Sequence, residues 1–204
     1  MMDFDAAVCY NGGRRGNIPF DMEAIRMSEK RFLIVVDMQN DFIDGSLGTP
    51  EAAAIVPAVA RRIEQARADG EEIIATLDTH PENYMELREG QRLPVPHCIR
   101  GTDGWRIRPE LMERLGGATL LEKPTFGSTR LPELIAARLG EGEAPRIELI
   151  GLCTDICVVS NALLLKAAFP EAEISVRRGC CAGVTPEKHE AALETMASCQ
   201  IDIL

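Results

Sequence analysis

The stretch "IELIGLCTDICVVSNALLL", residues 147–165, decides the fold. It begins with a short apolar run typical of a buried strand, passes through polar residues and ends in a second apolar run that continues as a predicted helix. A cysteine stands at each end of the polar part, Cys153 and Cys157. A strand, a tight connection and a helix in this order form one unit of an α/β fold with a parallel sheet.

The rest of the chain repeats this alternation of short runs rich in Ile, Val and Leu with longer helical stretches. The pattern predicts a doubly wound α/β domain with a six-stranded, mainly parallel sheet and helices on both faces. The predicted strands are residues 32–36, 72–77, 118–121, 146–150, 173–176 and 201–203. The predicted helices are residues 51–70 despite Pro57, residues 131–140, the stretch after Cys153, and residues 185–199 with Thr185 as N-cap.

Length and composition are those of one soluble globular domain: 204 residues, of which 46% are hydrophobic and 26% charged. The formal net charge of -10 repels nucleic acids and anionic membranes, so we exclude both as partners. No apolar run approaches the roughly 20 residues that cross a bilayer, and the N-terminus lacks the order of a secretory signal. We therefore expect a cytoplasmic protein that folds alone or as a symmetric oligomer.

The chain has seven cysteines, and none of them forms the C-x-x-C pairs of a zinc ribbon. In a reducing compartment they are expected to be free thiols. Most of them are predicted to be small buried apolar residues.

Residues 1–26 differ from the rest, because "NGGRRGNIP", residues 11–19, is turn-rich and polar and no clear periodicity precedes Arg31. A strand beginning at about Phe32 usually opens such a domain. We expect residues 1–26 to be either disordered or an extension ahead of a true translation start at Met27. Residues 27–204 then form the single domain. The intact mass of the protein from its native host tests this, and a mass that includes residues 1–26 rules out the later start.

Chemically active side chains follow four of the predicted strands. Asp37 follows the first strand, Asp78 and His80 the second, Lys123 the third, and the two cysteines the fourth. Ligands of open α/β sheets bind beyond the carboxyl ends of the strands, so these side chains are expected to share one site. Each alone is a common way for a strand to end, but together they indicate a catalytic site.

A thiol that hydrolyses an amide needs a base, a cation and backbone donors for the oxyanion. Asp37 and Lys123 supply the first two. Cys157 falls in the first turn of a helix that Thr154 or Asp155 can cap, where the helix dipole lowers a thiol pKa. We therefore predict that Cys157 is the nucleophile. Without the aspartate and the lysine, a packed or redox-active pair of thiols would be the better interpretation.

Three segments, "VVDMQNDF", "EKPTFGST" and "GLCTDICV", resemble the cysteine hydrolases of the isochorismatase-like superfamily. The resemblance covers about residues 31–204. It implies the isochorismatase-like hydrolase fold and a catalytic triad of Asp37, Lys123 and Cys157. It also implies a non-proline cis peptide between Leu152 and Cys153, and an oxyanion hole formed by the backbone N–H groups of Cys153 and Cys157.

The long turn-rich segment of residues 78–105 carries a candidate metal site. Asp78 and His80 are two residues apart at a strand end, so their side chains point the same way, and His97 lies in the same segment. Two imidazoles with carboxylates suit zinc, manganese or iron. Either histidine alone is equally well explained as a packing residue. The remaining histidine, His189, lies in a polar part of the last helix and is expected to be solvated.

The same segment resembles the metal loop of the nicotinamidase branch, in which the metal holds the pyridine nitrogen of the substrate. Asp78, His80 and His97 match that loop. A position that is often a third histidine has no histidine here. Glu89 is the preferred replacement, with Glu86 as the alternative.

The resemblance implies that nicotinamide is the substrate. Nicotinamidases commonly place an aromatic residue before the last histidine of the loop, whereas this chain has "RLPVPH", residues 92–97. Phe42 is expected to form one aromatic wall of the pocket, and Phe126 or Trp105 another. An enzyme for another small amide, ureido or carbamoyl compound, without a metal, stays open.

Two more distant alternatives are weaker. A non-catalytic ligand sensor would not need the complete triad, and the metal loop disfavours a vinyl-ether hydrolase of the isochorismatase type. The resemblance also implies a homo-oligomer, because dimers and tetramers are common among relatives.

Overall fold

The computed structural model describes residues 29–204. The expectations for residues 1–26 and for a start at Met27 lie outside this range. Six strands form one sheet in the order β3-β2-β1-β4-β5-β6, and each neighbouring pair is parallel. The predicted doubly wound fold is confirmed. The strands are β1 (Glu29–Val36), β2 (Glu72–Asp78), β3 (Thr119–Lys123), β4 (Ala144–Leu152), β5 (Glu173–Ala182) and β6 (Asp202–Ile203).

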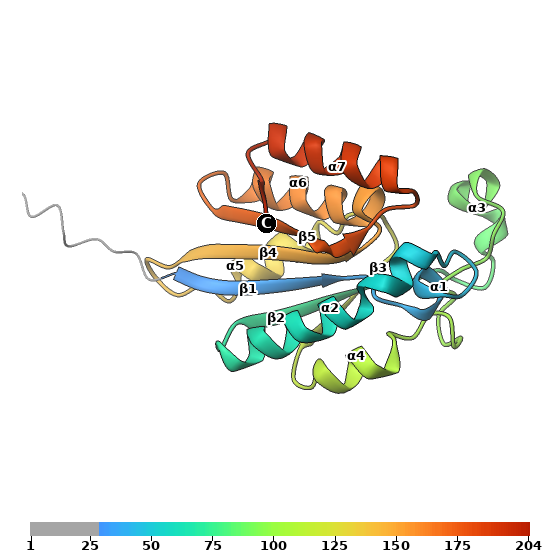
Figure 1. Cartoon of the computed structure of the whole chain (residues 1–204), viewed down its shortest axis with the longest axis horizontal. Coiled ribbons are helices and arrows are strands. Elements are labelled where there is room, and N and C mark those ends of the chain that lie inside the picture. The colour runs from blue at the N-terminus through green and yellow to red at the C-terminus, as the bar shows by residue number, and fades with distance from the viewer. Residues whose placement is uncertain (1–28) are drawn as a thin grey trace, which may run out of the picture.

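The helices cover both faces of this sheet (Figure 1). The core on one face includes side chains of α2 and α4, and the core on the other face includes side chains of α5, α6 and α7. None of the helices among residues 29–204 is long and apolar enough to cross a membrane. The helices are α1 (Asn40–Ile43), α2 (Pro50–Ala68), α3 (Arg88–Arg92), α4 (Pro109–Arg114), α5 (Arg130–Ala136), α6 (Val159–Ala168) and α7 (Pro186–Ser198), with a short 3-10 helix, η1 (Tyr84–Glu86).

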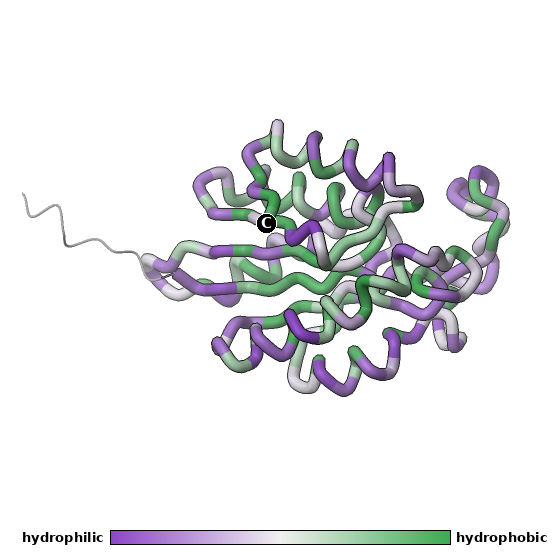
Figure 2. Tube along the Cα trace, viewed as in Figure 1, coloured by the Kyte–Doolittle hydropathy of each residue, from purple (hydrophilic) through white to green (hydrophobic). Residues whose placement is uncertain are grey.

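The central strand β1 explains why an apolar run without alternation forms a strand here. Leu33 and Val35 belong to the core on the α2 side, whereas Phe32, Ile34 and Val36 belong to the core on the α6 side. All five are almost fully buried. A strand covered on both faces has no polar side, which is the usual pattern in parallel sheets. Figure 2 shows these hydrophobic strands as a green centre between helices with mixed colours.

The order of the strands reverses between β1 and β4. From β1 the chain moves to β2 and β3 on one side, and from β4 it moves to β5 and β6 on the other. Crevices of open α/β sheets form at such a switch point, beyond the carboxyl ends of the strands. Asp37 follows β1 and Cys153 follows β4 at this point.

Helix ends follow their local sequence. The side-chain oxygen of Thr185 accepts from the backbone N–H of Lys188, at 3.3 Å, so the predicted cap of α7 is confirmed. Thr49 caps α2 in the same way and Pro50 stands in its first turn. Gly70, with φ of +71°, follows the end of α2, where a side chain would be strained. Pro57 is accommodated inside this helix.

Candidate active site

Asp37 lies directly beyond β1 and is completely buried. Its φ is +47°, so the backbone turns sharply where the strand ends. The hydroxyl of Thr76, on the neighbouring strand β2, donates to Asp37 Oδ1 at 2.6 Å. Burial raises the pKa of Asp37, and the nearby carboxylate of Asp78 adds to this, while Lys123 opposes it. A carboxylate with a raised pKa is a better proton acceptor than an ordinary aspartate.

Lys123 is the last residue of β3 and is buried at the centre of the site. Its Nζ lies 2.6 Å from Asp37 Oδ2 and 3.5 Å from Cys157 Sγ. A third contact, of 3.5 Å, joins it to Asp78 Oδ1. Burial opposes the charge of Lys123, but these neighbours outweigh it and raise the pKa of the ammonium. The lysine therefore stays charged while it touches the thiol.

Cys157 lies in a π-helical turn, η2 (Thr154–Val158), that precedes α6. The peptide bond between Leu152 and Cys153, directly before the turn, is cis. The expectation that Thr154 or Asp155 caps the helix is wrong, because the N-cap position is Cys153 and no side chain caps the turn. The wider turn shifts the hydrogen bonds, so the N–H groups of Ile156 and Val158 both donate to the Cys153 carbonyl.

The thiol of Cys157 is not activated in the way the sequence predicts. Burial raises its pKa well above the ordinary value, and the charge of Asp37 raises it further, while Lys123 lowers it. Desolvation shifts a pKa by several units, whereas a helix end contributes about 1 kcal/mol, so burial wins. Cys157 is therefore a neutral thiol at rest, 3.5 Å from the ammonium of Lys123.

Asp78, His80 and His97 form a compact cluster beside this triad, and each is at least nine-tenths buried. Their potential ligand atoms all lie within 4.8 Å of one another. Asp78 Oδ2 is 2.9 Å from His80 Nε2 and 3.6 Å from His97 Nε2. His97 Nδ1 donates to the carbonyl of Val95 at 2.9 Å, which leaves Nε2 as the nitrogen for a metal. The donor set fits a divalent metal.

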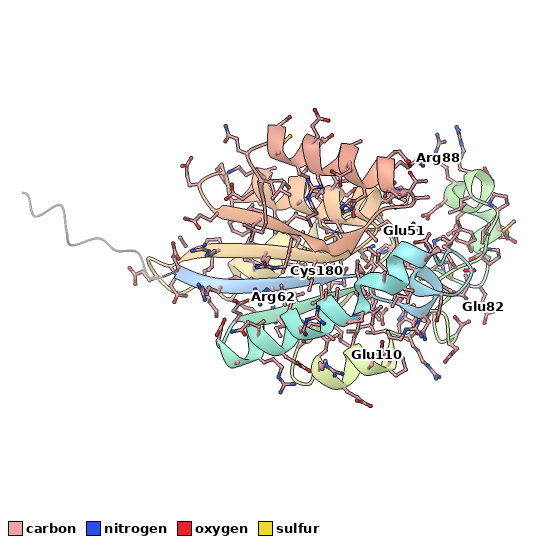
Figure 3. The ribbon with its side chains drawn as sticks, in the orientation of Figure 1. Glu51, Arg62, Glu82, Arg88, Glu110 and Cys180 are labelled. Atoms are coloured by element: carbon pink, nitrogen blue, oxygen red, sulfur yellow. The ribbon has the colours of Figure 1, made fainter. Side chains whose placement is uncertain are left out.

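Glu89 lies at the same cluster and Glu86 does not. Glu89 Oε1 is 3.7 Å from Nε2 of both His80 and His97. Glu86 is exposed and accepts from Asn83 instead. Glu89 belongs to α3, which packs mainly against η1 and projects from the end of the molecule (Figure 1). Figure 3 shows Arg88 on this projecting helix.

Comparison with known proteins identifies the family. The sequence profile described as isochorismatase domain matches residues 31–204. The chain belongs to the isochorismatase family. The crystal structure of a pyrazinamidase of Pyrococcus horikoshii in complex with zinc has 32% identity and a TM-score of 0.72, and covers 86% of this chain and 98% of that one.

Two curated members of the isochorismatase family are also similar along most of their length. The nicotinamidase of Escherichia coli is 27% identical, over 79% of this chain and 87% of the relative. The nicotinamidase/pyrazinamidase of Mycobacterium tuberculosis is 27% identical, over 85% of this chain and 98% of the relative. The family and these relatives make the chain an amide-hydrolysing enzyme.

The aromatic residues near the metal cluster differ in part from the expectation. The ring centroid of Phe42 lies 5.6 Å from that of His97. Tyr84, which the sequence pattern does not single out, packs edge-on against both His80 and His97 at 4.8 and 5.0 Å. Phe126 is half exposed, and among the described residues its ring makes no stacking contact with the two histidines.

Trp105, the other candidate for the pocket wall, lies beside Thr79. Its Nε1 donates to Thr79 Oγ1 at 2.8 Å, and its ring packs against the core on the α2 side. Among the described residues it makes no ring contact with the histidines.

Two buried amides hold this isochorismatase-family site together, and sequence reasoning missed both. Gln39 accepts from the Asp78 backbone N–H at 2.7 Å, and its Nε2 donates to the carbonyls of Asp78 and Trp105. Asn161 donates to the Cys157 carbonyl at 2.8 Å and accepts from the backbone N–H of Ser128. A polar residue inside an apolar run, as Asn161 is, was the available signal.

A cavity of about 790 Å³ lies away from this site. It is lined by side chains of α2, β4 and β5, among them Arg62, Glu148, Arg177 and Cys180. Figure 3 shows Arg62 and Cys180 on these elements. Arg62 and Arg177 both donate to the carboxylate of Glu148.

Proposed function

We propose that the enzyme hydrolyses nicotinamide to nicotinate and ammonia, with Cys157 as the nucleophile. One observation carries the proposal: the ammonium of Lys123 touches Asp37, Cys157 and Asp78, and Asp78 also belongs to the metal cluster. A thiol with a base and a cation serves amide hydrolysis, and a neighbouring metal cluster serves a substrate with a ring nitrogen. The named activities of the relatives support the same assignment.

The first step is the transfer of the thiol proton to Asp37. The thiol has a raised pKa, so it does not ionise by itself at neutral pH. Burial also raises the pKa of Asp37, which makes its carboxylate a better proton acceptor. Lys123, 3.5 Å from the sulfur, stabilises the thiolate as the proton leaves.

The sulfur of Cys157 then bonds to the carbonyl carbon of the carboxamide, and the carbonyl electrons move to its oxygen. Backbone N–H groups of Cys153 and Cys157 are the proposed donors to this oxyanion. Asp37 returns the proton to the amide nitrogen, the C–N bond breaks and ammonia leaves a thioester. Water, deprotonated by Asp37, then attacks the thioester carbon, the C–S bond breaks to release nicotinate, and Asp37 returns its proton to the Cys157 thiolate.

Asp78, His80, Glu89 and His97 are the residues that would hold a divalent metal. When bound, zinc, manganese or iron supplies a Lewis acid for the pyridine nitrogen and for ordered water. The chain itself orients the donors: His97 is fixed through the carbonyl of Val95, and Asp78 through its backbone bonds to Gln39. Phe42, beside His97, is the proposed aromatic wall of the substrate pocket.

One observation favours a second candidate substrate. Residues 92–97 carry no aromatic residue before His97, and in the described part of the chain the rings of Phe126 and Trp105 do not stack on the histidines. A pocket with one aromatic wall also suits another small amide, ureido or carbamoyl compound. The triad would act on it in the same way.

The test is release of ammonia from nicotinamide by purified enzyme, with and without added zinc, manganese or iron. Cys157→Ala serves as the blank, and Cys199→Ala, which changes an exposed cysteine, serves as the matched control. Metal-dependent release that is lost only in Cys157→Ala supports the proposal. No release by an enzyme whose Cys157 still reacts with alkylating agents rejects nicotinamide and directs the search to ureido and carbamoyl compounds.

A further inference from the structure

His189 is not solvated, contrary to the sequence-based expectation. It lies on α7, its side chain is only 13% exposed, and its Nδ1 is 2.8 Å from Thr154 Oγ1. Thr154 is completely buried and begins the π-helical turn that contains Cys157. A direct hydrogen bond therefore joins a histidine of α7 to the segment that presents the nucleophile.

A second contact ties the same turn to the same helix. Asp155 Oδ1 accepts from the backbone N–H of Val184, at 2.9 Å, in the connection that leads into α7. A Cβ atom added at Gly183 would lie 2.9 Å from Asp155 Oδ1 and 2.8 Å from the backbone nitrogen of His189. The start of α7 thus packs directly against the turn, without room for a larger residue.

We propose that His189 is a positioning residue that fixes the nucleophile turn through Thr154. The two residues hold the turn at its first position, next to Cys153, while Asn161 holds it from α6 at Cys157. A π-helical turn lacks the regular hydrogen bonds of an α-helix, so outside contacts must decide where Sγ lies relative to Lys123. The inference rests on the proposed role of Cys157 as nucleophile.

The charged groups around His189 favour one tautomer of its ring and so one direction of the hydrogen bond with Thr154. Glu190 Oε1 lies 3.9 Å from Nε2, which favours a proton on that nitrogen and leaves Nδ1 to accept from the Thr154 hydroxyl. The other charged groups that face it are Asp155 from the turn and Arg178 from β5. Burial lowers the pKa of His189, so the neutral imidazole prevails at pH 7.

The experiment compares Thr154→Val and His189→Leu, which remove the bond, with Thr154→Ser and His189→Asn, which keep a polar partner at each end. Thr195→Val, an exposed threonine of α7, is the matched control. Each variant is measured for kcat and KM with nicotinamide and for the rate of Cys157 alkylation by iodoacetamide, followed by mass spectrometry. Thermal unfolding shows whether each variant is folded.

We expect Thr154→Val and His189→Leu each to lower kcat by about tenfold or more with KM nearly unchanged, because a small misplacement of a reacting atom is costly. The double variant should lose no more than either single one. Alkylation of Cys157 should slow in both, because Sγ moves away from Lys123. Thr154→Ser, His189→Asn and Thr195→Val should stay close to the unchanged enzyme.

Faster alkylation of Cys157 together with the other buried cysteines would mean general loosening and would overturn the inference. Unchanged kcat and alkylation in Thr154→Val and His189→Leu would overturn it as well. If the unchanged enzyme does not act on nicotinamide, the proposed substrate fails, and the alkylation rates alone decide the role of His189. Slower alkylation in only the two bond-breaking variants then supports it.

Discussion

Lys123 Nζ lies 3.5 Å from Asp78 Oδ1, while the other oxygen of Asp78 lies 2.9 Å from His80 Nε2. One carboxylate therefore belongs to both the triad and the metal cluster. Burial opposes ionisation of Asp78, but hydrogen bonds from His80 and His97 outweigh it and hold its pKa well below the usual range. Asp78 therefore stays ionised, and its negative charge acts on both the triad and the metal cluster.

Replacing Asp78 by asparagine should weaken both halves together. The variant loses a metal ligand and the second anion beside Lys123, so we expect metal affinity and kcat each to fall by at least about tenfold. Metal content after dialysis against a chelator and kcat at saturating metal measure the two effects. Loss of metal affinity with an unchanged kcat would contradict the shared role.

Glu89 and Glu86 offer a matched pair for the fourth metal ligand. Glu89 lies 3.7 Å from both histidines, and Glu86 faces Asn83. We expect Glu89→Gln to weaken zinc binding by about tenfold or more, since it removes a negative donor, and Glu86→Gln to leave it unchanged. Titration calorimetry with zinc measures both. Equal affinities in the two variants would remove Glu89 from the ligand set.

The sequence predicts the fold and also that the residues at the carboxyl ends of the strands come together. Parallel strands place their carboxyl ends at one edge, so residues such as Asp37 and Lys123, distant along the chain, must come together there. The predicted strand limits are short by a few residues at β3 and β5, because polar residues such as Lys123 and Arg177 belong to the strands. Local composition therefore underestimates strands that contain polar residues.

Features that depend on loop geometry could not be predicted. The bonds of Gln39 to the backbone of Asp78, and the packing of Tyr84 on the histidines, need the path of a long loop. The cap expected at Thr154 or Asp155 fails because the turn begins one residue earlier than the sequence suggests, with Cys153 at the N-cap position. The thiol pKa was predicted with the wrong sign, because a sequence shows where a helix begins but not how deeply Cys157 is buried.

We expect the ion pairs of Glu148 with Arg62 and Arg177, which lie away from the site, to make the stability of the protein depend on pH. Burial raises the pKa of Glu148, but its bonds to Arg177 and Arg62 outweigh this and lower it overall. A lowered folded pKa means stabilisation that is complete above the unfolded value, about 4.3, and is lost as pH falls through the folded pKa. We expect Glu148→Gln to reduce the free energy of unfolding by about 1–3 kcal/mol at pH 7.

Urea unfolding at pH 7 and at pH 3 measures this dependence. The difference between Glu148→Gln and the unchanged protein should shrink at pH 3, where the carboxyl begins to be protonated. Glu194→Gln, on the exposed face of α7, is the control and should have little effect at either pH. A difference for Glu148→Gln that is the same at both pH values would exclude the charge as its cause.

Lys123 should control the reactivity of Cys157. Burial and Asp37 raise the pKa of this thiol, and Lys123 is the cation that lowers it. Alkylation of Cys157 by iodoacetamide should therefore be slow at pH 7, rise with pH, and become slower still in Lys123→Met, whose midpoint should move to higher pH. Exposed Cys199 is the internal reference and should react equally fast in both proteins. Met keeps most of the volume of Lys, so slower alkylation in the variant reports the loss of the charge. Faster alkylation of Cys157 in Lys123→Met would contradict the prediction, because it would mean that the lysine shields the thiol rather than stabilising its anion.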